Sequence, residues 1–138
     1  MRWLPYALLS AAFAGATAIL GKLGVAGLPS NLATAIRTLV ILVFAWAIVL
    51  GRGEHRALAA VDRRTLIFLI LSGVTTGLSW LAYFRALQLG PASRVAPIDK
   101  LSLPLTILLA WVVLGEALTF KSALGVGLMA AGALLTLR

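Results

Sequence analysis

The chain has 138 residues, of which 62% are hydrophobic and only 12% are charged, and its formal net charge is +8. A soluble domain has about 45–50% apolar and about 25% charged residues, and a small domain exposes much of its surface. The apolar excess excludes a soluble globular fold and indicates a membrane protein. The absence of cysteine excludes disulfides, thiolate metal sites and cysteine nucleophiles.

Enzyme chemistry has little support in the sequence. One histidine and four acids leave few ligands for a metal ion. No Ser-His-Asp constellation and no nucleotide fingerprint occurs, and the stretch "GATAILGK" (residues 15–22) lacks the spacing of a phosphate-binding loop. We therefore expect no enzyme activity, no cofactor and no metal site.

Five apolar runs are long enough to be transmembrane helices, which need about 20 residues and must satisfy their own backbone hydrogen bonds. They cover residues 3–23, 31–50, 66–87, 92–114 and 121–137. Gly, Pro and Ser punctuate the stretches between them. The expected fold is an all-α, polytopic membrane helix bundle with five transmembrane helices in one domain, residues 1–138. The first run is interpreted as a membrane helix rather than a signal peptide.

The basic residues indicate orientation and lipid contact rather than nucleic-acid binding. The positive-inside rule places in the cytoplasm the loop that holds Arg52, Arg56, Arg63 and Arg64. The bias is weak, because many bases fall on the outer side or in the outer half. These are Lys22, Arg37, Arg85, Arg94, Lys100 and Arg138. Such a weak bias permits insertion in both orientations.

Charged residues inside the predicted spans are the main candidates for function. Each costs at least ~2.5–3.5 kcal/mol at a helix centre on insertion scales, so it usually faces a cavity or a partner. The candidates are Arg37, Arg85, Asp99 and Lys100. Arg85 and Asp99 flank a short loop at similar depth and could pair. Two interpretations stay open: an ion pair that only fixes the helical hairpin, or the polar lining of a substrate path.

The stretch "RVAPIDKLSLPL" (residues 94–105) combines those charges with two prolines. Pro97 and Pro104 have no N–H to donate to the carbonyls four residues before them, so the helix should be distorted here. Interrupted helices often build transporter sites. We expect a kinked helix that lines a cavity, with Asp99 and Lys100 at or near it; the alternative is a packing kink with a snorkelling lysine.

Two further patterns lie on the third and fifth runs. Thr76, Ser79, Trp80 and Tyr83 form a polar-aromatic stripe at helical spacing, which serves either as a pocket wall or in packing and the interfacial belt. Small residues let helices approach closely, within one chain or between two copies. The glycines expected to do so are Gly73, Gly77, Gly125, Gly127 and Gly132.

Two stretches carry a family resemblance: "AILGKLGVAGLPSNLATAIRTLVIL" (residues 18–42) and "YFRALQLGPASRVAPIDKLSLPLTILLAWVVLGEALT" (residues 83–119). The order of their motifs resembles an EamA domain of the drug/metabolite transporter superfamily. Most members carry two five-helix units as inverted repeats, and this chain has one. The resemblance implies that two copies pair as an antiparallel homodimer with dual topology.

The same resemblance implies secondary transport of a small metabolite or amphipathic compound by alternating access, in a bacterial or archaeal inner membrane. Expected partners are a small-molecule substrate, membrane lipid and a second copy, and Asp99, the only acid well inside a span, is the expected coupling group. The net positive outer half favours an anionic or zwitterionic substrate. The residues expected to contact substrate are Thr76, Trp80, Tyr83, Arg85, Asp99 and Lys100. An alternative is a non-transporting subunit or scaffold that needs a separate partner, and a third interpretation is a reconstructed or designed minimal unit.

Overall fold

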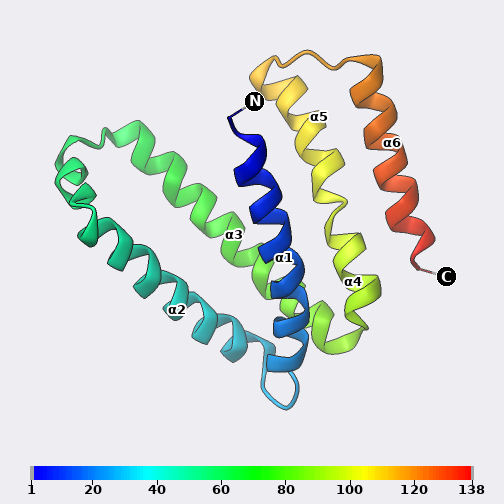
Figure 1. Cartoon of the computed structure of the whole chain (residues 1–138), viewed down its shortest axis with the longest axis horizontal. Coiled ribbons are helices and arrows are strands. Elements are labelled where there is room, and N and C mark those ends of the chain that lie inside the picture. The colour runs from blue at the N-terminus through cyan, green and yellow to red at the C-terminus, as the bar shows by residue number, and fades with distance from the viewer. Residues whose placement is uncertain (1, 138) are drawn as a thin grey trace. The chain divides into compact units, whose positions relative to one another are not determined.

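The structure is a computed structural model that describes residues 2–137 (Figure 1), and every regular element in that range is helical. In chain order the elements are α1 (Leu4–Gly24), α2 (Ser30–Gly51), the 3₁₀ helix η1 (Glu54–Ala60), α3 (Arg63–Leu89), α4 (Ala92–Asp99), α5 (Ser102–Leu114) and α6 (Phe120–Leu135). The all-helical prediction is confirmed for these residues. The two ends of the expected 1–138 domain, including Arg138, lie outside the described residues.

Within residues 2–137, four helical runs are long and apolar enough to cross a membrane: α1, α2, α3 and the run Ala92–Leu114, which comprises α4 and α5. The last helix, α6, has 16 residues. At 1.5 Å per residue it is about 24 Å long, shorter than the ~30 Å hydrocarbon core of a typical bilayer. The four candidate spans agree with the predicted membrane helix bundle, while the predicted fifth span over residues 121–137 is not confirmed.

The chain divides into two compact units. The first unit described here is Gly21–Gln88, which contains the end of α1, then α2, η1 and α3. In this unit α2 and α3 run in opposite directions and η1 joins them at one end (Figure 1). Its buried side chains come from the opposite end, where the α1–α2 turn, the start of α2 and the last turns of α3 lie. They are Val25, Ser30, Ala33, Thr34, Phe84 and Leu87.

The other unit comprises the described residues up to Leu20 and from Leu89 onward. Here α6 packs along both α4 and α5. Thr119 caps the N-terminus of α6, because its Oγ1 accepts a hydrogen bond from the backbone N–H of Ser122 at 3.2 Å.

The loop with four arginines is more ordered than its sequence suggested. It contains η1, and α3 begins at Arg63, three residues before the predicted start. Asp62 caps α3, because its Oδ2 accepts the backbone N–H groups of Arg64 and Thr65 at 3.1 and 3.2 Å. Hydrogen bonds from Thr65, and then from Arg64, hold the pKa of Asp62 below its ordinary value by stabilising the carboxylate.

Most large apolar side chains of the long helices are exposed, and few are buried. No water-soluble fold of this size tolerates so much exposed apolar surface. A lipid solvent removes the penalty, because hydrocarbon tails contact leucine and valine side chains as favourably as a protein core does. The exposure pattern therefore agrees with helices that lie in a membrane.

Candidate functional site

The chain contains a helix interruption between Pro97 and Pro104: α4 ends at Asp99 and α5 begins at Ser102. Pro104 cannot donate to the carbonyl of Lys100, and the backbone N–H of Leu103 donates to that carbonyl instead, at 2.9 Å. A second short bond joins the N–H of Leu101 to the carbonyl of Ile98 at 3.0 Å. These i→i+3 bonds replace the α-helical pattern and satisfy the backbone at the break.

Asp99 and Lys100 lie at this interruption and face each other. Lys100 Nζ is 3.5 Å from Asp99 Oδ2, and the two side chains are 52% and 34% exposed, respectively. A pair this exposed contributes little stability, so both groups stay available to a ligand. The expected pairing of Asp99 with Arg85 would join the two units, and it stays a prediction.

A second cluster surrounds Arg37 in the unit Gly21–Gln88. The guanidinium carbon Cζ lies 4.9 Å from the ring centroid of Trp80 and 4.5 Å from that of Phe84. Tyr83 packs against Phe84 edge to face, with centroids 5.9 Å apart. Trp80 and Tyr83 belong to the predicted stripe, whereas Phe84 was missed. The signal was its position four residues after Trp80, which puts both rings on one helix face.

Arg37 places a charge within a long apolar helix, so the groups that contact it show how that charge is compensated. It lies seven residues after the first residue of α2, about 10 Å along the helix axis. The ion pairs within residues 2–137 are Arg52–Glu54 and Asp99–Lys100, so Arg37 pairs with rings and not with an acid. Two cation–π contacts, worth about 0.5–2 kcal/mol each, offset part of the cost of a charge in the membrane.

The other predicted residue on α3, Thr76, already uses its hydroxyl within its own helix. Thr76 Oγ1 donates to the backbone carbonyl of Ser72 at 2.8 Å, and the side chain is exposed. The hydroxyl can still accept a hydrogen bond. Contact between Thr76 and a substrate therefore stays a prediction.

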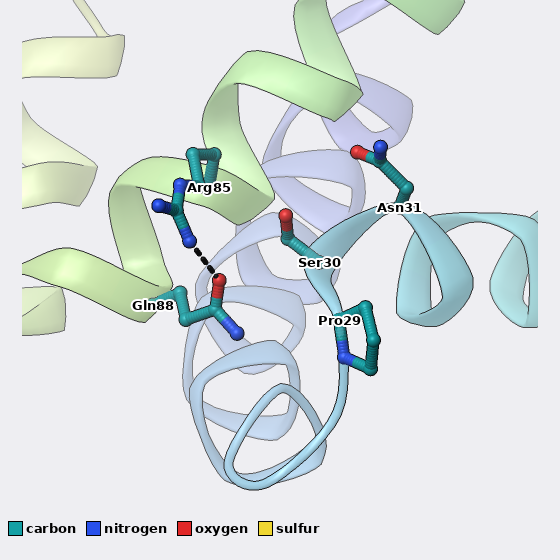
Figure 2. A pocket seen from close by; sticks show the side chains of 5 residues that line it. All are labelled: Pro29, Ser30, Asn31, Arg85 and Gln88. Carbon is teal, nitrogen blue, oxygen red and sulfur yellow. Dashed lines mark hydrogen bonds between the residues drawn. The ribbon is translucent and has the colours of Figure 1, made fainter.

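A pocket of about 440 Å³ opens at the end of the same unit, lined by Pro29, Ser30, Asn31, Arg85 and Gln88 (Figure 2). Arg85 Nη1 donates to Gln88 Oε1 at 2.6 Å. Gln88 Nε2 in turn donates to the backbone carbonyl of Leu28 at 2.7 Å, which ties the end of α3 to the α1–α2 turn. Arg85 thus lies in a pocket that was not predicted from the sequence. Its other lining residues, Gln88 and the first residues of α2, were not among the predicted site residues.

In this unit Gly21 lets α1 and α3 pack closely together, and it was not among the predicted packing glycines. A Cβ added at Gly21 would lie 3.2 Å from Phe84 Cζ and 3.5 Å from Leu87 Cδ1, so only glycine fits without a shift. Nearby, Lys22 Nζ donates to the backbone carbonyl of Leu87 at 2.6 Å.

The five predicted packing glycines have open space around them. A Cβ added at any of them would meet no heavy atom of the described chain within 4 Å, and they are Gly73, Gly77, Gly125, Gly127 and Gly132. Contact between two copies through these glycines stays a prediction.

Metal binding finds no support in the part of the chain that the structure covers. Residues 2–137 hold no group of three or more His, Cys, Asp or Glu side chains that could bind a metal ion. The candidate groups are therefore the cationic and aromatic side chains around Arg37, the Asp99–Lys100 pair and the Arg85 pocket.

Comparisons with known proteins identify a family and a relative of the whole chain. The sequence model of the EamA-like transporter family matches residues 1–138. A Sinorhizobium sp. protein named "Uncharacterized transporter in cobO 3'region" is 53% identical over 133 residues, which cover 96% of this chain and 94% of that protein. That relative is therefore also a chain of about this size. No solved structure matches the chain.

Proposed function

This chain belongs to the EamA-like transporter family, and on that premise we propose that it is a secondary transporter of a small anionic or zwitterionic metabolite. The observation that carries the substrate class is Arg37, whose guanidinium lies on a helix long and apolar enough to span a membrane. It contacts two aromatic rings and, within residues 2–137, no acid. Rings hold the flat faces of a guanidinium and leave its N–H edges free to donate. Those edges match a carboxylate in a bidentate arrangement.

The other proposed substrate contacts are Trp80 and Tyr83, which belong to the Arg37 cluster, together with Thr76 and Arg85 on α3 and Asp99 and Lys100 at the helix interruption. Aromatic walls suit the apolar part of an amphipathic compound, because such pockets are mostly apolar with a few placed polar groups. Asp99 is the proposed coupling group. Support comes from its place at a break between two half-helices, where transporters tend to build ion and substrate sites.

The proposed working form is an antiparallel homodimer in a bacterial inner membrane, which alternates its access between the two sides. Three features support it: a single family unit in the chain, bases spread over both sides, and large exposed apolar surfaces on every long helix. The Sinorhizobium relative supports the bacterial source. Two inverted copies would supply the two halves that rock against each other around a central site.

Flux measurements in proteoliposomes test the proposal. The purified chain is reconstituted and assayed for counterflow of labelled amino acids and small carboxylates at a series of pH values. We expect carrier-mediated flux that varies with pH in the native chain, and flux without that variation in Asp99→Asn, because the amide cannot exchange a proton. The matched control is Glu116→Gln, an exposed acid in the α5–α6 loop, which should keep the native profile.

Each opposite result has a definite meaning. A native pH profile in Asp99→Asn would remove the coupling role from Asp99. The absence of flux for every compound in a well-folded preparation would contradict transport by this chain alone and favour a subunit or scaffold that needs a separate partner.

A further inference from the structure

We propose that the pocket lined by Pro29, Ser30, Asn31, Arg85 and Gln88 binds a phosphate group, supplied by the headgroup of an anionic lipid. This site is separate from the Arg37 cluster and shares only Arg85 with the proposed substrate contacts, and lipid binding to it can be measured without transport. It would give the chain a defined lipid contact at the membrane surface. Three independent features of the pocket carry the inference: a positioned cation, a helix N-terminus and the hydroxyl of a serine that is 7% exposed.

The cation is Arg85, whose orientation is fixed before any ligand arrives. Its single bond to Gln88 uses one of the five N–H donors of the guanidinium and leaves four. Gln88 is itself fixed by its bond to the carbonyl of Leu28. No ion pair within residues 2–137 neutralises Arg85. A charged fork held in place by an amide is well suited to phosphate oxygens.

The helix N-terminus is that of α2, which begins at Ser30 with Pro29 as its cap residue and has no side-chain cap hydrogen bond. The first backbone bond of this helix runs from the N–H of Ala33 to the carbonyl of Pro29, at 3.1 Å. The N–H groups of the preceding residues have no partner inside the helix. Together with the helix dipole they favour an anion at this point.

The hydroxyl belongs to Ser30, which is only 7% exposed. Its backbone carbonyl accepts a bond from Thr34, but no hydrogen bond of its own hydroxyl is present among the described residues. Figure 2 shows the oxygen directed into the space between Arg85 and Asn31. The hydroxyl therefore lies open to the pocket with its O–H unused, so it can donate a hydrogen bond to an anion bound there.

The depth of the pocket favours a lipid as the source of the phosphate. Ser30 is the first residue of α2, and Arg85 lies four residues, or about 6 Å, before the end of α3. Both therefore lie near helix ends, where the headgroups of a bilayer are found. Phosphate groups of anionic lipids are concentrated at this level and are attracted by basic residues.

Binding of short-chain phosphatidylglycerol to the purified chain in neutral detergent, counted by native mass spectrometry, tests the site. We expect Arg85→Gln to bind about tenfold more weakly, because charge-assisted hydrogen bonds are lost, and Ser30→Ala to bind severalfold more weakly. The matched control is Arg94→Gln, an exposed arginine on α4 outside the pocket, which should bind like the native chain. Ser30→Ala keeps the Arg85–Gln88 bond. Weaker lipid binding by Ser30→Ala would therefore support the site even if Arg85→Gln failed to fold.

Inorganic phosphate distinguishes the two sources of the ligand. If millimolar phosphate does not displace the lipid from the native chain, the lipid headgroup is the ligand. If phosphate binds and displaces it, and Arg85→Gln loses that binding, the phosphate site stands with a free anion as its ligand. Equal lipid binding by the native chain and Arg85→Gln, or an equal loss in Arg94→Gln, would overturn the proposal.

Discussion

Replacing Phe84 by alanine is expected to cost about 3 kcal/mol of stability and to lower the thermal midpoint of the purified chain clearly. Phe84 is 1% exposed, and its ring contacts the guanidinium of Arg37 and fits against the bare Cα of Gly21. Alanine would leave a cavity in the packed end of the unit. We take the lower end of the usual range, because in lipid the lost packing matters more than transfer from water.

The control is Phe68→Ala on the same helix. Phe68 also lies under an arginine, because Arg64 Cζ is 5.9 Å from its ring centroid, but Phe68 is 59% exposed. Its removal creates no cavity, and we expect a loss below about 1 kcal/mol. The two variants are compared by thermal unfolding in detergent, with size-exclusion chromatography as the readout. Equal midpoints for Phe84→Ala and Phe68→Ala would show that the buried end is not the stable core of this unit.

Replacing Arg37 by methionine is expected to reduce transport at least about tenfold while the chain stays folded. Methionine keeps the length and the apolar contact with Trp80 and Phe84 but removes the charge that would bind the anionic group of the substrate. A bidentate contact of this kind is worth about 1.5–3 kcal/mol. Stability should hold or rise, because a guanidinium in a membrane span is costly.

Two further variants separate a binding role of Arg37 from a structural one. Arg37→Lys keeps the charge but not the planar fork, so we expect intermediate transport. Arg64→Met removes a second arginine–phenylalanine contact at the start of α3, away from the Arg37 cluster, and transport should stay near the native level. Native flux in Arg37→Met, measured in the same proteoliposomes, would mean that the cluster only clamps α2 to α3.

Those features that depend on solvent and local chemistry were predictable from the sequence. The apolar runs gave the positions of the long helices, because a spanning helix must be apolar over its whole length. The missing N–H groups of Pro97 and Pro104 indicated a distortion, and the structure has a break between them. The family resemblance was readable from motif order and agrees with the family match.

Features that depend on contacts between distant residues were not predictable. Arg37 lies 47 residues before Phe84 in the chain, and no local pattern indicates that a cation on α2 reaches a ring on α3. Gly21 was overlooked for the same reason, since its need for glycine arises from Phe84 and Leu87. The early start of α3 was missed because the cap signal of Asp62 was read as part of a basic loop.

The most direct test of the antiparallel homodimer is the topology of the chain in intact cells. Two variants each carry a single cysteine: His55→Cys in η1, before α3, and Ser93→Cys in α4, after α3. If α3 spans the membrane, the two cysteines lie on opposite sides of the membrane. The native chain has no cysteine, so a membrane-impermeant thiol reagent meets a clean background. We predict partial labelling at both positions, which means that both orientations coexist. Complete labelling at one position and none at the other would establish one orientation and contradict the antiparallel pair.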